Sequence, residues 1–333
     1  MQTGNIFRVL AVAGILCASI GNGHAQTFRG VNLPSAAFAS GKIPGRYGYD
    51  YLFPKDTVVQ YYTQQGANIF RLSILWERLQ PALNGPLDTD YLLRIQQFVE
   101  TAQKSGAKTI IDLHNYGNYR GQQIGSPEVS PQAFVDLWQR LAKTFAPNGN
   151  VFFGLMNEPK LSSAQAWADV QQLAIDAIRN VGAKNTILVS GIKWDSAQHL
   201  PQDNGDALIS LHDPQNDLLF EVHEYFDGDA SGTKPDCVSP DQAVARLAPA
   251  TDWFKAHNVK GFLGEFGASR TPECLQALGK VASYLKENRG SWAGWTYWAG
   301  GPLWGEYMFT IEPTRSGDER PQMTVLTPFF KNQ

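Results

Sequence analysis

The sequence lacks a long run of charge of either sign and lacks the Gly-rich signatures of nucleotide enzymes. Its 333 residues include 28 Lys and Arg against 31 Asp and Glu, a formal net charge of −3. The missing basic run argues against a nucleic-acid partner. No dinucleotide or phosphate-binding fingerprint occurs, and no Gly-x-Ser-x-Gly elbow. We therefore expect no nucleic acid, no cofactor and no serine-hydrolase chemistry.

Apolar runs long enough to cross a membrane are also missing. The best candidate, Val9–Ile20, is too short for a comfortable span. Arg8 precedes it, and Gly23-His24-Ala25 follows with small residues suited to a signal peptidase. We predict a secretory signal peptide over residues 1–25, and a secreted protein, extracellular or periplasmic, with no membrane partner. The alternative is an uncleaved anchor.

Cysteine is scarce, with three in the chain. One of them, Cys17, lies in the predicted signal, which leaves Cys237 and Cys274. An even count in an exported chain permits one disulfide. The alternative is a pair of free thiols, because the sequence alone does not bring the two residues together.

No Pro/Ser/Thr-rich linker and no repeat divides residues 26–333, so we predict one domain there. Short apolar runs typical of buried parallel strands alternate with amphipathic helical patterns. The predicted strands are Arg29–Leu33, Asn68–Ile74, Lys108–His114, Val151–Asn157, Asn185–Gly191, Leu218–Tyr225, Gly261–Phe266 and Ala293–Trp298. The predicted helices are Asp56–Gln65, Asp88–Ser105, Pro131–Phe145, Ser163–Val181, Pro240–His257 and Pro272–Asn288.

Eight strands alternating with helices predict an α/β protein with a single (β/α)₈ barrel. The rival fold is an open doubly wound sheet, which often carries a Gly-rich phosphate loop after its first strand. Here the first strand runs into Pro34-Ser35-Ala36-Ala37, which is no such loop. The barrel is therefore favoured.

Polar groups gather where the predicted strands end, and a barrel enzyme places its active site at those ends. Glu158 and Glu265 each close an apolar run on the fourth and seventh strands. Cleavage of a glycosidic bond needs two such carboxyl groups in opposed protonation states. The alternative is that each forms a rim salt bridge, which is less plausible for both together.

Seven short motifs occur in order along the predicted strands. They are Arg29-Gly30-Val31-Asn32, Phe70-Arg71-Leu72, Asp112-Leu113-His114-Asn115-Tyr116, Met156-Asn157-Glu158-Pro159, Val222-His223-Glu224-Tyr225, Gly264-Glu265-Phe266-Gly267 and Gly294-Trp295-Thr296-Tyr297-Trp298-Ala299. In these motifs the chain resembles glycoside hydrolase family 5, and within it the endo-β-1,4-glucanases, or cellulases. The resemblance spans roughly Arg29 to Phe330. One Asn-Glu-Pro alone would be weak evidence, but the whole ordered set is specific.

The resemblance implies a role for each matching residue. Glu158 would be the acid/base and Glu265 the nucleophile of a retaining double displacement. The supporting residues would be Asn157 on the sugar 2-hydroxyl, Arg71 and Tyr225 on Glu265, His114 and His223 on substrate and carboxylates, and Trp298 as a sugar platform. A cation near Glu265 should also lower its pKa.

Position along the chain indicates the surroundings of several other polar and aromatic residues. We expect Asp112 to bond inside the barrel, Glu224 to be structural and His212 to lie at the surface. Trp194 and Trp304 follow strands five and eight, where each could either pack or stack on glucose. Metal-dependent barrel hydrolases commonly carry His-x-His on the first strand; this chain does not, and we expect no metal.

The sequence therefore predicts an endo-acting, retaining glycoside hydrolase that cleaves β-1,4-glucosidic bonds in cellulose or related β-glucans. We expect a monomer whose partner is the polysaccharide substrate. One alternative keeps the mechanism but acts on β-mannan, mixed-linkage glucan or xyloglucan. Another is a non-catalytic carbohydrate-binding barrel, which the presence of both glutamates opposes.

Overall fold

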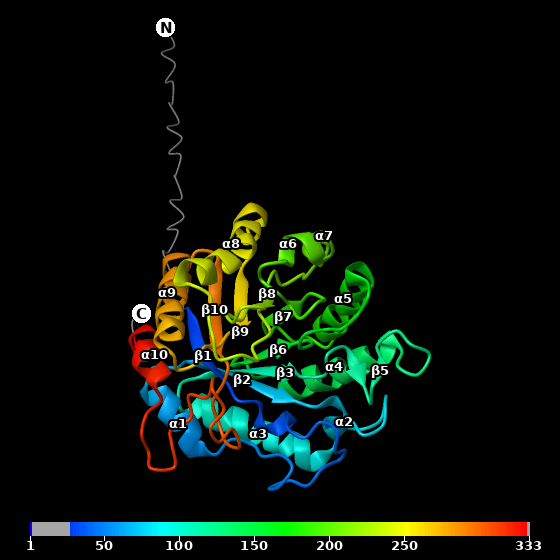
Figure 1. Ribbon diagram of the computed structural model, residues 1–333. Helices are drawn as coiled ribbons and strands as arrows, with labels where there is room; N and C mark the ends of the chain where they lie inside the picture. The colour runs from blue at the N-terminus through cyan, green and yellow to red at the C-terminus, as the bar shows by residue number, and fades with distance from the viewer. Residues whose placement is uncertain (2–26, 332–333) are drawn as a thin grey trace.

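A computed structural model describes residue 1 and residues 27–331, and it shows a closed barrel of eight parallel strands (Figure 1). The barrel closes in the order β1-β10-β9-β8-β7-β6-β3-β2. This confirms the predicted fold class, whereas the predicted signal peptide lies outside the described residues. The strands are β1 (Phe28–Asn32), β2 (Ile69–Ile74), β3 (Lys108–Leu113), β6 (Val151–Gly154), β7 (Ile187–Ser190), β8 (Leu218–His223), β9 (Gly261–Glu265) and β10 (Trp292–Tyr297).

Helices surround the barrel and connect successive strands, as a (β/α)₈ fold requires (Figure 1). A small hairpin, β4 (Asn118–Tyr119) and β5 (Gln122–Gln123), extends the connection after β3. The helical elements are η1 (Pro34–Ala37), α1 (Asp56–Gln64), α2 (Trp76–Leu79), α3 (Thr89–Lys104), α4 (Pro131–Phe145), α5 (Ala164–Asn180), α6 (Leu200–Asp203), α7 (Gly205–Ile209), α8 (Pro240–His257), α9 (Pro272–Glu287) and α10 (Pro321–Lys331).

Local capping explains why the long helices begin where the sequence predicted. The Asp88 side chain accepts a hydrogen bond from Tyr91 N at the start of α3, and Ser163 accepts one from Ala166 N at the start of α5. Such bonds satisfy backbone donors that have no partner within the helix. The sequence missed η1, α2, α6, α7, α10 and the hairpin. Apart from α10, each of these helices and strands is at most five residues long, too short to show a helical or strand period, and α10 contains Pro328.

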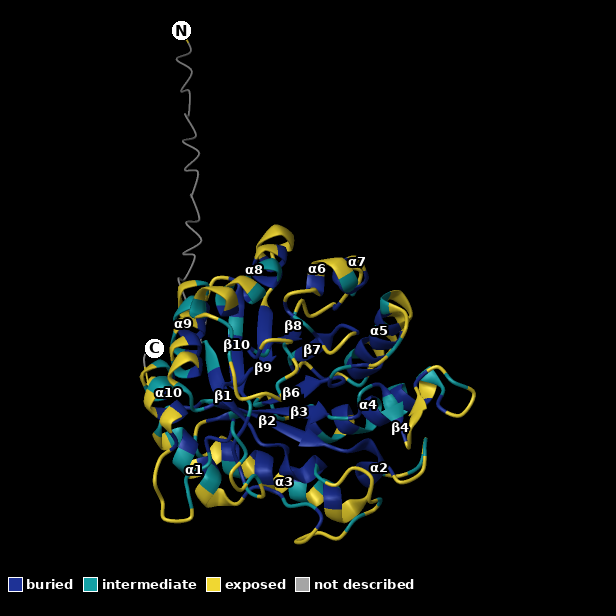
Figure 2. Ribbon diagram, in the orientation of Figure 1, coloured by how far each residue is buried: buried dark blue, intermediate teal, exposed yellow. Residues whose placement is uncertain are grey.

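The barrel interior is filled by a compact apolar layer. Side chains alternate between the two faces of a strand, and each of these residues points into the barrel near the start of its own strand. The outer faces of the strands pack against the helices in a second, larger core, and Figure 2 shows the strands buried and the outer helix faces exposed. The inner layer consists of Ile69, Ile110, Phe152, Leu188, Leu219 and Phe262.

A polar layer lies above this apolar layer, two residues further along the strands. It holds Arg71 on β2, Asp112 on β3 and Glu221 on β8, all buried. A glycine at the same level makes room for these long side chains: a Cβ on Gly264 would lie 2.1 Å from Glu221 Oε1. The alternation therefore places a charged network directly beneath the barrel mouth.

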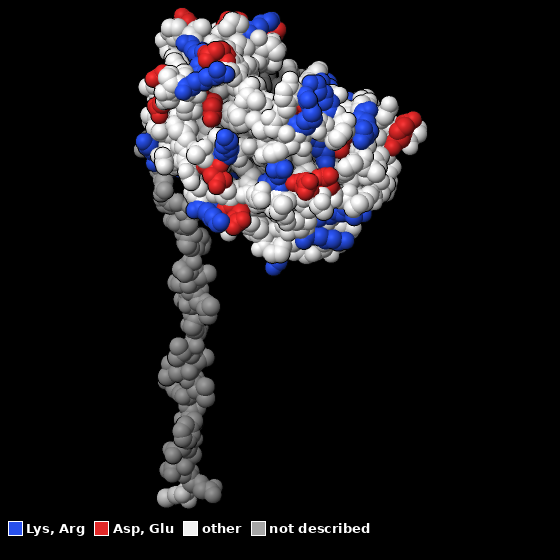
Figure 3. Space-filling model, turned by 90° about the horizontal axis from the view of Figure 1, so that it is seen from below, with Lys and Arg blue, Asp and Glu red and all other residues white. Residues whose placement is uncertain are grey.

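The outer surface is mixed in charge. On the face shown in Figure 3, Lys and Arg are interspersed with Asp and Glu among neutral residues. Within the described part of the chain, no helix combines the length and apolarity needed to span a bilayer.

One disulfide ties the connection after β8 to α9. Cys237 precedes α8 and Cys274 lies buried in the first turn of α9, with their Cα atoms 5.2 Å apart. The predicted pairing is confirmed. Because the bridge closes a loop with a sequence separation of 37, it constrains the unfolded chain considerably.

Replacing both Cys237 and Cys274 with Ala is expected to lower the free energy of unfolding by about 2–4 kcal/mol, because the unfolded chain regains the entropy of an open loop. Urea unfolding followed by circular dichroism measures the change. Reductant should shift the wild-type midpoint toward that of the double variant and leave the variant unaffected. An identical wild-type midpoint with and without reductant would contradict a stabilising bridge.

Candidate active site

The centre of the barrel mouth is the guanidinium of Arg71, which is fully buried. Its three nitrogens each face a carboxylate: Nη1 lies 3.0 Å from Glu265 Oε1, Nη2 lies 3.0 Å from Asp112 Oδ1, and Nε lies 2.7 Å from Glu221 Oε1. The planar donor set of arginine suits such multiple pairing. One cation thereby joins carboxylates from β3, β8 and β9.

These pairs dominate the electrostatics of the buried network. Burial alone would lower the pKa of Arg71, but the carboxylates of Asp112, Glu221 and Glu265 outweigh burial and raise it. Burial would raise the pKa of Asp112, yet Arg71 and His114 hold it below its ordinary value. Asp112 thus bonds inside the barrel, as predicted.

Two asparagines complete the coordination of Arg71. Nη1 donates to Asn32 Oδ1 at 3.0 Å, and Nη2 donates to Asn157 Oδ1 at 2.8 Å. The bond to Arg71 fixes which end of the Asn157 amide faces the guanidinium. The other end, the buried Asn157 Nδ2, has no hydrogen-bond partner among the described residues. It therefore remains a donor available to a ligand.

Glu158 and Glu265 face one another across the mouth. Their carboxylate oxygens approach within 4.8 Å. Tyr225 Oη donates to Glu265 Oε2 at 2.8 Å, while His223 Nδ1 lies 2.9 Å from Glu158 Oε1 and 3.8 Å from Glu265 Oε2. The Glu158 side chain is 14% exposed and that of Glu265 5% exposed, so Glu158 is the more accessible of the two.

The pKa values in this pair follow from burial and charge. Burial raises the pKa of Glu265, against the opposing effects of His223 and Arg71. The predicted cation is present, and Arg71 does lower the pKa of Glu265, but desolvation is the larger effect, so the net shift is upward. Burial would lower the pKa of His223, yet the carboxylates of Glu265, Glu158 and Glu221 raise it well above its ordinary value.

His114 joins the network through Asp112 and an aromatic neighbour. Its Nδ1 lies 2.8 Å from Asp112 Oδ2, and its Nε2 lies 3.3 Å from Tyr116 Oη. The His114 ring stacks against the Trp298 indole, with ring centres 5.7 Å apart and an interplanar angle of 14°. The structure thus places Trp298 against His114, whose ring bonds to Asp112 in the buried network.

The two loop tryptophans occupy different surroundings. Trp304 packs edge-on against Trp298, stacks on Tyr307 and donates its indole N–H to Gly300 O at 2.9 Å. Trp194 is 57% exposed. Of the two readings left open by the sequence, packing describes Trp304, whereas Trp194 presents an open indole face.

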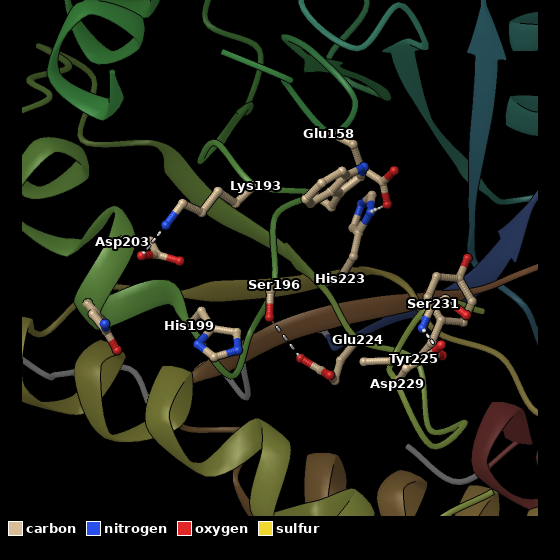
Figure 4. A pocket seen from close by; sticks show the side chains of 13 residues that line it. Glu158, Lys193, Ser196, His199, Asp203, His223, Glu224, Tyr225, Asp229 and Ser231 are labelled. Carbon is tan, nitrogen blue, oxygen red and sulfur yellow. Dashed lines mark hydrogen bonds and ion pairs between the residues drawn. The ribbon is translucent and has the colours of Figure 1, made fainter. Parts of the chain in front are cut away.

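A cleft of about 770 Å³ opens beside Glu158. Figure 4 shows Glu158 and His223 pointing toward each other, with the paired Lys193 and Asp203 to one side of them. Trp194 and Tyr225 also line the cleft. The cleft extends from Glu158 along the loops that follow β7 and β8.

The ligand atoms of Glu158, His223 and Glu265 lie within 4.8 Å of one another, a spacing that a metal ion could bridge. Coordination requires a neutral imidazole. Both ring nitrogens of His223 already lie within hydrogen-bond distance of carboxylates, with Nδ1 2.9 Å from Glu158 Oε1 and Nε2 3.3 Å from Glu221 Oε1, an arrangement that suits a ring donating to both.

Four further polar residues test or extend the predictions from sequence. His212 is exposed, and Glu224 is buried, with its Oε2 accepting from Gln198 N at 3.0 Å, so both predictions are confirmed. Sequence reasoning missed Glu221 and Asp195. Glu221 has the same strand parity as His223, which was a usable signal. Asp195 lies in a loop and had none.

Replacing Arg71 with Met is expected to destabilise the protein by about 3–5 kcal/mol, because three buried carboxylates lose their cation. The deficit relative to wild type should be larger at pH 7 than at pH 4, since protonated carboxyls need no cation. Urea unfolding at both pH values measures it. A deficit that is equal at the two pH values would contradict the electrostatic origin.

Comparison with known proteins agrees with this geometry. The model of the cellulase family, glycosyl hydrolase family 5, matches residues 22–301. The chain is 35% identical to probable endo-beta-1,4-glucanase B of Neosartorya fischeri over 334 residues, covering 99% of this chain and 100% of that protein. It is 38% identical to endoglucanase gh5-1 of Neurospora crassa over 286 residues, covering 85% of this chain and 72% of that protein.

Two solved structures share the fold closely. XacCel5A, determined in complex with cellopentaose, is 43% identical with a TM-score of 0.90, covering 92% of this chain and 100% of that one. Endoglucanase Cel5A of Pseudomonas stutzeri, determined with cellobiose, is 37% identical with a TM-score of 0.86, covering 92% of each chain. The chain therefore belongs to the cellulase family, glycosyl hydrolase family 5.

Proposed function

We propose that this protein is an endo-acting β-1,4-glucanase that cleaves its substrate with retention, using Glu158 as acid/base and Glu265 as nucleophile. The observation that carries the proposal is the approach of the two carboxylates within 4.8 Å beside an open cleft. Retaining glycosidases hold their carboxyl groups about 5–5.5 Å apart, whereas inverting enzymes need about 6.5–9.5 Å to admit a water.

In the first step, Glu265 attacks the anomeric carbon and the bond to the leaving sugar oxygen breaks. Glu158 gives that oxygen a proton, so that the departing chain leaves as an alcohol. Arg71 and Tyr225, each bonded to one oxygen of Glu265, fix the direction of attack. The greater exposure of Glu158 suits a group that meets the leaving chain in the cleft.

In the second step, Glu158 removes a proton from water, whose oxygen attacks the anomeric carbon and releases the Glu265 carboxylate. The charge on Glu265 is masked in the covalent intermediate, which is what allows one residue to serve as acid and then as base. His223, bonded to Glu158 Oε1, orients that carboxyl for both transfers.

The remaining polar and aromatic groups are proposed to hold the glucan. Asn157 Nδ2 would donate to the 2-hydroxyl of the sugar at the cleavage point, and its bond to Arg71 presents it for that contact. Trp298 with His114 would form the platform at the same subsite. Trp194 would stack on a sugar in the cleft, and Trp304 would support Trp298.

We further propose that residues 1–25 are a signal peptide and that the protein is secreted. We also propose that it acts as a monomer. The disulfide between Cys237 and Cys274 supports export, because such bonds persist in oxidising compartments. A polymeric substrate that cannot enter cells requires the same location.

The variant Glu265→Gln is expected to lose activity on a soluble cellulose derivative by roughly 10⁴-fold or more, because it removes the nucleophile while keeping the shape of the side chain. Reducing-end release measures the rate. The exposed Glu306→Gln variant is the matched control and should retain wild-type activity. NMR of wild-type products should show the β anomer first. Near-normal activity of the Glu265 variant, or initial α product, would contradict the mechanism.

The pH profile offers a separate prediction. Glu265 must be ionised to attack, and burial raises its pKa, so kcat/KM should fall on the acid side with a midpoint above the ordinary Glu value of about 4.3. Initial rates across pH 3–8, with circular dichroism to confirm that the fold persists, give that midpoint. An acid limb centred at or below the ordinary value would contradict the assigned electrostatics.

A further inference from the structure

The chain turns sharply just after β7. Three consecutive residues, Lys193, Trp194 and Asp195, have left-handed φ angles of 60°, 60° and 54°. Side chains other than glycine rarely adopt this region, and such strain persists only where the surrounding structure holds it. The turn exposes Trp194 to the cleft and buries Asp195, which is 2% exposed.

Asp195 contacts the main chain of two active-site residues. Its Oδ2 accepts the backbone N–H of Glu158 at 3.0 Å, and its carbonyl oxygen accepts the backbone N–H of His223 at 2.8 Å. The side chains of Glu158 and His223 bond to each other at 2.9 Å. One buried residue thus holds the backbones of both members of this pair.

Glu158 needs such support, because its own backbone is strained. Its φ is +43°, at the point where the chain leaves β6 and turns toward Pro159. The hydrogen bond that the Glu158 N–H donates to Asp195 Oδ2 restrains the peptide that begins this turn. Without it a buried donor would lose its partner, and the turn could relax. The direction of the Glu158 carboxyl would then change.

We propose that Asp195 is a positioning residue that holds Glu158 in the geometry required for proton transfer. The inference rests on the proposed role of Glu158 as acid/base. Asp195 touches neither substrate nor reacting atoms in this account, and acts through the backbone of Glu158.

The carboxyl acts here as a hydrogen-bond acceptor. Burial, assisted by the Glu221 and Glu158 carboxylates, raises the pKa of Asp195 well above its usual range despite the opposing effect of His223. Its Oδ1 is buried and has no hydrogen-bond partner among the described residues. An asparagine would keep the acceptor at nearly the same shape, so Asn should replace Asp where Ala should not.

The residues that follow Asp195 have hydrogen bonds that do not involve the Asp195 side chain. Glu224 Oε2 accepts from Gln198 N at 3.0 Å and from Ser196 Oγ at 3.3 Å, the latter drawn in Figure 4. Ala197 N also donates to His223 O at 2.9 Å. Loss of the Asp195 side chain therefore removes the bond to Glu158 while these anchors remain.

A misplaced acid/base residue changes the kinetics in a way that differs from a general disruption of the active site. With 2,4-dinitrophenyl β-cellobioside, Glu265 forms its bond to the anomeric carbon as the dinitrophenolate departs with its electron pair and without a proton. Formation of the glycosyl-enzyme then needs no acid. Hydrolysis of the glycosyl-enzyme still needs Glu158 to take a proton from water. In a variant whose Glu158 is misplaced, the glycosyl-enzyme therefore accumulates.

The experiment compares Asp195→Ala, Asp195→Asn and Glu158→Ala on a soluble cellulose derivative and on the dinitrophenyl substrate. For Asp195→Ala we expect kcat/KM on the polymer to fall about 10²-fold. On the dinitrophenyl substrate, kcat and KM should fall together, leaving kcat/KM within a few-fold of wild type, with a burst of dinitrophenolate. Asp195→Asn should stay close to wild type on both substrates.

The matched control is Asp213→Ala. Asp213 is also a buried aspartate that accepts backbone N–H groups, from Gln215 at 3.1 Å and Asp217 at 3.0 Å, but it precedes β8 at the opposite end of the barrel. Loss of the Asp213 side chain should lower the melting temperature and leave kcat/KM unchanged on both the polymer and the dinitrophenyl substrate.

Three results would overturn the inference: wild-type polymer activity in Asp195→Ala, an equal loss on both substrates, or an Asn variant as impaired as the Ala variant. A variant that fails to fold gives no burst, and the Asn variant then decides. If Glu158→Ala loses kcat/KM equally on the polymer and on the dinitrophenyl substrate, the proposed acid/base assignment fails. If Glu158→Ala loses kcat/KM mainly on the polymer and Asp195→Ala loses it equally on both, only the role of Asp195 fails.

Discussion

The active site depends on the burial of one guanidinium beneath the barrel mouth. Arg71 carries the only positive charge that contacts Asp112, Glu221 and Glu265 together among the described residues. Placing three carboxylates in a dry interior is unfavourable unless a cation and hydrogen bonds compensate them. The barrel provides the geometry, since strands β2, β3, β8 and β9 all point their alternate residues at the same central point.

Strand alternation made much of this site predictable. All eight strands were located from their apolar runs, and residues at their carboxyl ends were expected to meet because parallel strands in a barrel share one mouth. The same alternation could have identified Glu221, which shares the inward parity of His223. What the sequence could not reveal was the balance of effects on Glu265, where burial outweighs the neighbouring cation and depends on packing in three dimensions.

The loops were less predictable, for a physical reason. The turn at Lys193–Asp195 has left-handed backbone angles, but it contains no glycine from which such angles could have been predicted. The surrounding contacts hold it. Short helices such as α6 and α7 carry too few residues to display a period. Trp194 and Trp304 looked equivalent as loop tryptophans, yet one is exposed to the cleft and the other packs under Trp298. Their difference comes from tertiary contacts alone.

The apolar layer inside the barrel has a consequence for how a polymer can be handled. Side chains such as Phe152 and Phe262 fill the interior just below the charged network, so nothing can pass along the barrel axis. A glucan strand would therefore lie across the rim, where the loops that follow β7 and β8 form a cleft beside Glu158. The barrel interior thus offers no channel that a strand would have to enter by its end.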